Sequence, residues 1–353
     1  MPRSRPGSGR FLGLRLSLRN PAFLLRLSLG LIFWPVRAAC GETAVVERRI
    51  VSMGTVLELR VGALDRPAAL AASEEALREI ERVERLLSTW RSGGPLDRLN
   101  RARPQESVGL GRETADLLAE VEAWSRRTGG AFDPTVLPLV RIWDLRGAGR
   151  IPSAAEQQRA LEVTGWRQFS FDRERAVAKR LSGAGIDEGA WGKGYALDTA
   201  KGALNRAGVQ QAVIDLGGQV FVLGSAPVTI AHPGRRGFPV ASLFLSNASL
   251  STSGDSERAR PVEGRRIGHL LDPRTGRPAE DFGSASAIAP SGLVADILST
   301  AFFVLGPEAG LALSEKLRRE GFPNEALFLV IHGDRLEAIA SPGLTYELED
   351  SNR

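Results

Sequence analysis

The chain has 353 residues, of which 43% are hydrophobic and 25% are charged. These values are typical of a globular protein with one large or two intergrown domains, and they exclude a disordered, collagen-like or coiled-coil chain. The net charge of +5 suggests a nucleic-acid-binding protein, but residues 1–39 hold seven arginines and no acidic residue. The rest of the chain carries 39 basic and 41 acidic side chains, a net charge of −2, so a nucleic-acid partner is excluded.

Residues 1–40 have the pattern of an export signal. Scattered arginines precede a short apolar run over residues 27–36, and small residues follow it. The run is shorter than the ~20 apolar residues that a membrane-spanning helix needs. We therefore expect an exported protein, on the periplasmic side of a bacterial inner membrane.

The single cysteine, Cys40, comes directly after this leader. A lone cysteine at this place is typical of a lipid-anchored exported protein. The alternative is an unmodified thiol after ordinary cleavage behind Ala38, and Arg37 stands where a lipoprotein signal usually has Leu or Val. With one cysteine the chain forms no intramolecular disulfide, so its stability must come from its core.

The N-terminal half of the exported part predicts a strand pair followed by helices. Residues 45–61 alternate in polarity around Met53-Gly54-Thr55, which indicates two strands or one bulged strand. Ser153 and Glu156 are spaced as a capping box at the start of a helix. Apolar residues at helical spacing predict the helices at residues 68–87, 113–127, from 153 onward, and 192–207.

The C-terminal half predicts many short strands and a long apolar helical region. Helices come early and strands cluster late, without regular β-α-β alternation. This order favours an α+β fold with a mixed, largely antiparallel sheet core and flanking helices. The predicted strands are residues 212–216, 220–223, 228–231, 241–245, 267–271, 284–288, 326–331 and 336–340, with helices at 293–305 and 308–318.

Five short stretches combine glycine with carboxylate, hydroxyl or single basic groups. Each one alone is also explained as a turn or a capped helix end. They are residues 129–135, 187–195, 252–255, 269–276 and 295–300.

Asp296 stands inside an apolar helix and must be paired, ligated or exposed. Ser299 and Thr300 follow at i+3 and i+4, on the same helical face. Three hard oxygen ligands on one face suit Mg²⁺. The alternative is a buried carboxylate that is hydrogen-bonded to the two hydroxyls.

Gly192-Lys193-Gly194 at a helix start provides backbone N–H groups, the positive end of the helix dipole and an ammonium group. These features favour a phosphate site. The stretch lacks the spaced glycine of a Walker A loop and is not Gly-x-Gly-x-x-Gly, so neither a P-loop nor a dinucleotide fingerprint is present. Trp90 or Trp191 could stack on a ring system, or either could belong to the core.

Taken in order, these stretches resemble the FAD:protein FMN transferases, the ApbE-type flavin transferases. The resemblance covers about residues 50–310 and includes Met53-Gly54-Thr55, residues 87–100 and all five stretches. It implies that residues 41–353 form one catalytic domain, an exported Mg²⁺-dependent enzyme that binds FAD. The enzyme would transfer FMN to a Ser or Thr of a target flavoprotein, which we expect to be membrane-bound, and release AMP.

The resemblance also implies the site residues. Ser299 replaces a carboxylate of some family members, and Ser256 stands where an aromatic residue commonly follows residues 252–255. The implied FAD contacts are Met53, Trp90, Ala131, Phe132, Asp133, Asp187, Lys193 and Leu271. The implied metal ligands are the Ala190 carbonyl, Asp296, Ser299 and Thr300.

For the reaction, we expect Lys193 to neutralise pyrophosphate charge beside the metal, because phosphoryl transfer depends mainly on positioning and charge neutralisation. We expect His269 to accept the proton of the target hydroxyl, since an imidazole titrates near neutral pH; the alternative is a strand-end histidine hydrogen-bonded to a loop. Two other functions stay open. One is an FAD pyrophosphatase that yields FMN and AMP, and the other is an exported flavin-binding lipoprotein without activity.

Overall fold

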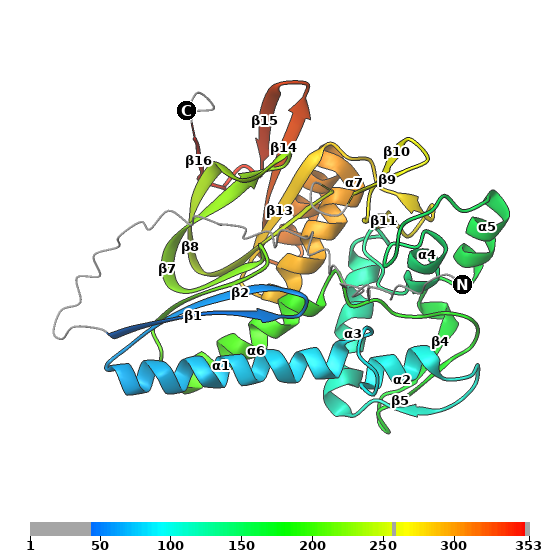
Figure 1. Cartoon of the computed structure of the whole chain (residues 1–353), viewed down its shortest axis with the longest axis horizontal. Helices are drawn as coiled ribbons and strands as arrows, with labels where there is room; N and C mark the ends of the chain where they lie inside the picture. The colour runs from blue at the N-terminus through cyan, green and yellow to red at the C-terminus, as the bar shows by residue number, and fades with distance from the viewer. Residues whose placement is uncertain (1–43, 256–258, 350–353) are drawn as a thin grey trace, which may run out of the picture. The chain divides into compact units, whose positions relative to one another are not determined.

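The computed structural model describes residues 44–255 and 259–349 (Figure 1). Every element named below lies within residues 44–349. The predicted leader of residues 1–40, with Cys40, lies outside the described residues, and so does Ser256.

A nine-stranded sheet forms the centre of the described part, and all its neighbouring strands are antiparallel. The strand order is β1-β2-β6-β7-β8-β13-β14-β15, and β16 pairs with β8. The predicted α+β class is therefore confirmed. The strands are β1 (Ala44–Ser52), β2 (Thr55–Ala63), β6 (Gln211–Leu216), β7 (Val220–His232), β8 (Arg235–Gly254), β13 (Gly283–Ala289), β14 (Glu325–His332), β15 (Arg335–Ala340) and β16 (Glu347–Leu348).

The described residues also form three small sheets. The single strand predicted over residues 267–271 is wrong, because β10 ends at Ile267 and β11 begins at Leu271. Between these two strands the backbone N–H of His269 donates to a side chain, Asp255 Oδ1, at 2.9 Å. The small sheets are β3 (Val108–Gly109), β5 (Val177–Arg180) and β4 (Phe169–Asp172) in this order, β9 (Arg260–Val262) with β10 (Arg265–Ile267), and β11 (Leu271–Asp272) with β12 (Arg277–Pro278).

Some of the helices begin at a side chain that caps them. The side chain of Asp65 accepts the N–H of Ala68 at 2.8 Å and starts α1, and Ser153 and Glu156 form the predicted capping box of α5. The helices are α1 (Arg66–Leu87), α2 (Pro95–Arg101), α3 (Arg112–Arg127), α4 (Leu137–Ile142), α5 (Ala154–Glu162), α6 (Gly192–Arg206) and α7 (Gly292–Arg319), with a 3₁₀ turn at Trp166–Gln168.

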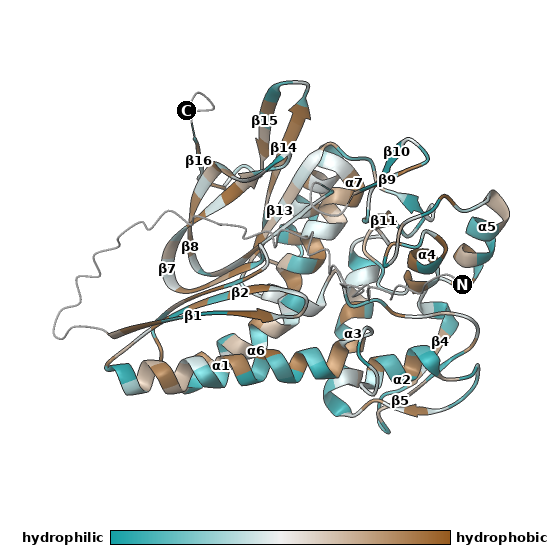
Figure 2. Ribbon diagram, in the orientation of Figure 1, coloured by the Kyte–Doolittle hydropathy of each residue, from teal (hydrophilic) through white to brown (hydrophobic). Residues whose placement is uncertain are grey.

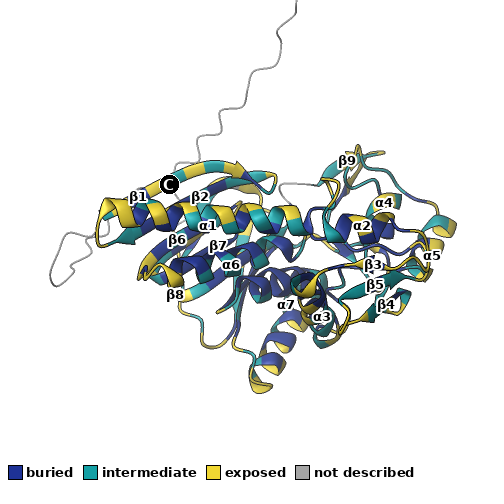
Figure 3. Cartoon of the chain, turned by 90° about the horizontal axis from the view of Figure 1, so that it is seen from below, coloured by how far each residue is buried: buried dark blue, intermediate teal, exposed yellow. Residues whose placement is uncertain are grey.

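Both faces of the sheet carry apolar side chains. Successive strand residues point to opposite sides, and neighbouring positions on β7 are apolar. On β7, Phe221 joins the larger core cluster, whereas Val220 and Val222 join a second cluster on the other face. Helices α1, α6 and α7 cover the first face: α1 packs on β1, β2 and α6, and α7 packs on β8 and β13. The side of α1 that faces away is polar and exposed (Figures 2 and 3).

The last helix, α7, supports one side of the candidate site. The sequence predicts two helices here, over residues 293–305 and 308–318, and the structure confirms them: Gly306 (φ 77°), before Pro307, is non-helical and divides α7 into two helical segments. Among the described helices α7 is the one long and apolar enough to cross a membrane, but half of its most apolar window is buried. Ile297, Leu298 and Phe302 are fully buried, as expected for the core helix of a globular domain.

Candidate functional site

The first turns of α6 and α7 lie in direct contact. The backbone N–H of Gly194 donates to Asp296 Oδ2 at 2.9 Å. A Cβ on Gly194 would lie 2.2 Å from the carbonyl oxygen of Gly292, so only glycine permits this approach. The contact brings the predicted phosphate stretch and the predicted metal carboxylate into one site.

The carbonyl of Ala190 lies just before the N-cap of α6, Trp191. The Gly194 N–H is one of the first N–H groups of the helix, which have no carbonyl partner within it, and Asp296 accepts it. No hydrogen bond to the Ala190 carbonyl is present within residues 44–255 and 259–349. A carbonyl oxygen without a donor, together with a carboxylate that is only 5% exposed, is a suitable ligand for a hard cation.

The hydroxyl groups predicted beside Asp296 differ in their environment. Ser299 is fully buried, and its Oγ lies 2.9 Å from Ser253 Oγ and 3.1 Å from Ser251 Oγ, both on β8. Thr300 Oγ1 has a longer contact of 3.4 Å with Ser253. Asp296, Thr300 and the Ala190 carbonyl therefore fit Mg²⁺ best, whereas the hydroxyl of Ser299 is already engaged with the sheet.

The donor set at this place is one of hard oxygens. Within the described part of the chain no group of three or more His, Cys, Asp or Glu side chains could hold a metal ion. One carboxylate with neutral oxygens suits Mg²⁺, which keeps several waters and shares phosphate oxygens with a substrate.

Lys193 and Met53 lie at the start of α6. Lys193 is half-buried and forms no ion pair or hydrogen bond with the residues that the structure describes. Met53 (φ 48°) and Gly54 (φ 71°) form the tight turn between β1 and β2, and Met53 Cε would lie 3.9 Å from a Cβ on Gly192. An ammonium group without a partner among the described residues and an apolar side chain therefore border the helix start.

Trp90 and Asp187 are joined by Arg146, which the sequence analysis does not identify. The Cζ of Arg146 lies 4.5 Å from the centroid of the Trp90 ring, and its Nη2 lies 2.5 Å from Asp187 Oδ2. Trp90 is 67% exposed, so its ring can stack on a planar ligand. One arginine among 42 carries no signal in the sequence, and only the fold identifies it.

Glu188 binds the residue that precedes Trp90 in the chain. Its carboxylate accepts the backbone N–H of Thr89 at 3.0 Å and the Thr89 hydroxyl at 2.5 Å. Burial raises the pKa of Glu188, and the neighbouring charge of Asp187 raises it further. Glu188 therefore anchors the segment that carries Trp90.

The Ala131-Phe132-Asp133 stretch follows the end of α3. The side chains of Ala131 and Phe132 are buried in the core, so only their backbone can touch a ligand. Asp133 Oδ1 accepts the N–H and the hydroxyl of Thr135, and burial raises the pKa of Asp133. The next residue, Pro134, accepts the N–H of Asp187 at 2.7 Å, which brings this loop to Asp187.

His269 lies in the loop before β11, and Leu271 is the first residue of that strand. His269 Nδ1 lies 2.8 Å from Asp255 Oδ1 at the end of β8. Leu271 is buried in a small cluster with Leu139 and Trp143, so its backbone, and not its side chain, is the part that can meet a ligand.

The contacts join the predicted residues into one chain of neighbours. Trp191 Nε1 donates to the Asp187 carbonyl at 2.8 Å, and this bond links the Trp90 group to the start of α6. Trp191 itself is fully buried and is a core residue. Ser253, which is on β8 two residues before Asp255, has its hydroxyl oxygen near those of Ser299 and Thr300. No hydrogen bond or ion pair of the described residues joins His269 directly to the start of α6.

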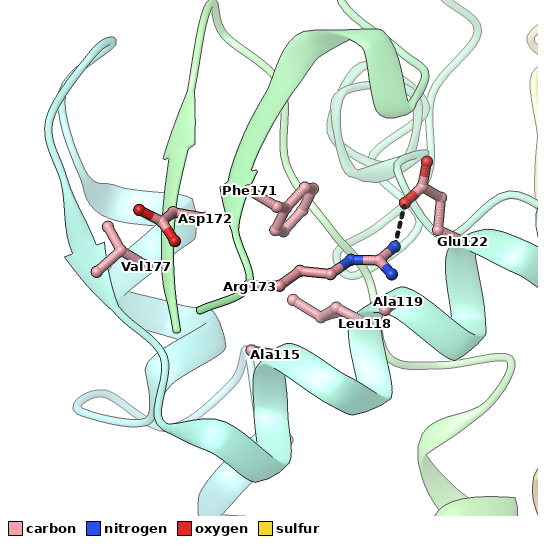
Figure 4. A pocket seen from close by; sticks show the side chains of 8 residues that line it. All are labelled: Ala115, Leu118, Ala119, Glu122, Phe171, Asp172, Arg173 and Val177. Atoms are coloured by element: carbon pink, nitrogen blue, oxygen red, sulfur yellow. Dashed lines mark ion pairs between the residues drawn. The ribbon is translucent and has the colours of Figure 1, made fainter. Parts of the chain in front are cut away.

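A small pocket between α3 and the β4–β5 hairpin lies apart from these residues. Figure 4 shows its lining, in which Arg173 and Glu122 form an ion pair at 3.7 Å. None of the predicted site residues lines this pocket, so it is not the candidate site.

Comparison with known proteins places the chain in a family. The model of the ApbE family matches residues 53–322. The FAD:protein FMN transferase of Treponema pallidum is 33% identical, over 82% of this chain and 87% of that protein. The enzyme of the same name from Salmonella typhimurium is 28% identical, over 85% and 89%.

Solved structures agree with the sequence comparison. The ApbE protein of Thermotoga maritima superimposes with a TM-score of 0.75 at 28% identity, covering 85% of this chain and 97% of that one. The flavinyl transferase ApbE of Pseudomonas stutzeri gives a TM-score of 0.73 at 28% identity, covering 85% and 95%. This chain therefore belongs to the ApbE family of flavin transferases.

Proposed function

We propose that this chain transfers FMN from FAD to the hydroxyl of a Ser or Thr in a target protein, in a Mg²⁺-dependent reaction that releases AMP. The observation that carries the proposal is the hydrogen bond from Gly194 to Asp296. It brings a cationic helix start and a buried carboxylate together, which is the combination that a pyrophosphate with a bound cation requires. The names of the similar enzymes support FAD as the donor of FMN.

In the proposed reaction the target oxygen attacks the phosphorus on the riboflavin side of the pyrophosphate. A new P–O bond to the target forms, the P–O bond to AMP breaks, and AMP leaves with the bond's electron pair. His269 accepts the proton of the hydroxyl. Lys193, which pairs with no side chain that the structure describes, offsets negative charge on the pyrophosphate.

Asp296, Thr300 and the Ala190 carbonyl are the residues that we propose as metal ligands. Bound Mg²⁺ would neutralise the pyrophosphate and stabilise the departing AMP. The oxygen donors of the site suit this ion, and the Ser299 hydroxyl supports Thr300 through Ser253.

The flavin ring is assigned to the exposed face of Trp90. Arg146 holds the opposite face of this ring, so the indole is ordered before a ligand arrives. An ordered platform loses less side-chain entropy on binding than a mobile one.

The test uses the purified chain with FAD and MgCl₂, with and without a fraction of exported membrane proteins. The transferase predicts AMP release together with flavin fluorescence on a protein band that survives a denaturing gel, with the modification mapped to Ser or Thr. AMP and free FMN without labelled protein would instead identify a pyrophosphatase. FAD binding without AMP would identify a flavin-binding protein.

We also propose that the protein acts after export, attached to the periplasmic side of the inner membrane through a lipid on Cys40. The basic leader, its apolar run and the position of Cys40 support this location. Cell fractionation of Cys40→Ser tests it: the variant should move from the membrane to the soluble exported fraction. A soluble wild-type protein that begins at Ala39 would contradict the lipid anchor and leave the transferase proposal intact.

A further inference from the structure

A buried carboxylate that the sequence analysis leaves without a role holds His269. Asp255, at the end of β8, is 1% exposed. Its Oδ1 accepts the backbone N–H of His269 at 2.9 Å and lies 2.8 Å from the ring nitrogen Nδ1 of the same residue. Backbone and imidazole of His269 are thus fixed by one oxygen atom.

This contact determines the tautomer of the imidazole. An ionised carboxylate only accepts hydrogen bonds, so Nδ1 must carry the hydrogen. In the neutral ring Nε2 then has a free lone pair, the state that a base requires. The two other histidines differ: His232 Nδ1 accepts the N–H of Gly234, and His332 Nε2 lies 2.9 Å from Glu337.

The environment of the second carboxylate oxygen of Asp255 lowers the stability of the fold. Oδ2 is buried and has no hydrogen-bond partner in the part of the chain that the structure describes. A buried polar atom without a partner costs stability, and such atoms are expected where function requires them. A Cβ on Gly268 would lie 2.0 Å from Oδ2, so the glycine is what allows the carboxylate to take this position.

The neighbouring charges leave the contact between Asp255 and His269 undisturbed. Arg266 Nη2 donates to the backbone carbonyl of Asp255 at 3.2 Å and lies 3.6 Å from Asp281 Oδ2, so it pairs with Asp281. Burial raises the pKa of Asp281, and the charge of Asp255 raises it further. Of these groups His269 alone bonds to the Asp255 carboxylate.

We infer that Asp255 is the positioning residue of His269: it fixes the Nδ1–H tautomer and aims Nε2 at the acceptor hydroxyl. The inference rests on the proposed function, in which His269 is the base. As the bond between the target oxygen and phosphorus forms and AMP leaves, the hydroxyl proton passes to Nε2. The carboxylate of Asp255 then stabilises the imidazolium through the Nδ1–H bond.

The first measurement needs no activity. The chain has three histidines, so ¹⁵N NMR of the histidine-labelled protein resolves every ring. We expect one ring, assigned by its loss in His269→Gln, to be the Nδ1–H tautomer in the wild type. Asp255→Ala and Gly268→Ala should abolish that state, whereas the matched control Gly183→Ala should keep it, because a Cβ on Gly183 meets nothing within 4 Å.

Gly268→Ala is the sharper of the two variants, since it retains every functional group. The φ of Gly268 lies outside the left-handed region, so alanine adds no backbone strain and acts through the clash with Asp255. A wild-type His269 with its hydrogen on Nε2 would overturn the inference.

The second measurement is AMP release from FAD with MgCl₂. Asp255→Ala should lower kcat by about 10²-fold, the usual contribution of a positioned base, and leave the KM for FAD within about twofold. In a His269→Gln background the same change should cost nothing further, because residues that act as a unit are not additive.

The outcomes separate this inference from the proposed function. A further tenfold loss in the double variant, or wild-type kcat in His269→Gln, would overturn the role of Asp255 as a positioning residue. A wild-type chain that releases no AMP would instead overturn the proposed function, and the NMR measurement would still decide whether Asp255 sets the tautomer.

Discussion

The backbone N–H of Gly194 donates to Asp296 Oδ2 at 2.9 Å and thereby attaches the first turn of α6 to the first turn of α7. The Gly292 carbonyl, 2.2 Å from a Cβ on Gly194, also accepts a hydrogen bond of 2.9 Å from Gln219 Nε2. The hydrogen bond from Gly194 and the one from Gln219 thus both hold the first turn of α7 in place.

Gly194→Ala should separate the two helices. We expect it to lower the free energy of unfolding by about 1–3 kcal/mol, the range of an overpacked core, and to weaken FAD binding. The matched control is Gly202→Ala on the same helix, whose Cβ would meet only the end of Arg206 at 3.4 Å. The control should stabilise the chain by up to about 1 kcal/mol through helix propensity. Urea unfolding and FAD titration measure both; equal effects of the two variants would contradict the packing argument.

Asp296→Asn and Asp296→Ala separate the metal role of this side chain from its structural role. Asparagine keeps an oxygen acceptor for the Gly194 N–H but removes the charge that a cation needs. Both variants should lose AMP release and the rise in melting temperature on adding MgCl₂, whereas only alanine should destabilise the metal-free chain. AMP release by Asp296→Asn at the wild-type rate without added metal would contradict the metal assignment.

Most of the fold follows from local signals in the sequence. The turn at Met53 and Gly54, the capping box of Ser153 and Glu156, and the antiparallel strands are all where periodicity and turn chemistry predict them. The break between β10 and β11 could not be predicted, because it depends on Asp255, which is 14 residues before His269 in the chain.

The candidate site is only partly readable from the sequence. Residues near one another in the chain, such as Asp187 and Lys193, carry their own signal. Arg146 and Asp255 act through side chains that the fold brings from far away, and arginine is too common here to attract attention. The burial of the Ala131, Phe132 and Leu271 side chains is also a tertiary property, and it changes their expected contacts from side chain to backbone.

Lys193→Ala should weaken the binding of FAD by about tenfold or more and leave that of riboflavin nearly unchanged. The reason is that an ammonium group at a helix start, unpaired within the described part of the chain, is suited to bind phosphate, which riboflavin lacks. Calorimetric titrations with both ligands check this. Equal losses for FAD and riboflavin would place Lys193 at the ring or make it structural.

Arg146→Ala should weaken FAD and riboflavin alike, since it releases the Trp90 ring that both ligands would use. Arg146→Lys should recover only part of the affinity, because an ammonium group cannot both stack on Trp90 and bond Asp187 and Thr89 as the planar guanidinium does. Arg126→Ala, which removes an exposed ion pair with Glu122, is the control and should change neither affinity. Wild-type affinity for riboflavin in Arg146→Ala would contradict the role of Trp90 as the ring platform.

Asp133→Asn should stabilise the chain at neutral pH while it weakens FAD binding. Burial raises the pKa of Asp133 above its ordinary value of 3.8, so the folded chain holds the proton more tightly than the unfolded chain does. Stability therefore falls as the pH rises from the unfolded pKa through the raised folded pKa, and the charged carboxylate costs stability above that window. Asparagine keeps an oxygen for the N–H and the hydroxyl of Thr135, both of which Oδ1 accepts, and carries no charge. Its melting temperature should exceed that of the wild type at pH 7, and the difference should vanish below about pH 3, where the wild-type carboxyl is protonated in both states. A difference that persists at low pH would show that the amide acts through packing and not through the removal of a buried charge.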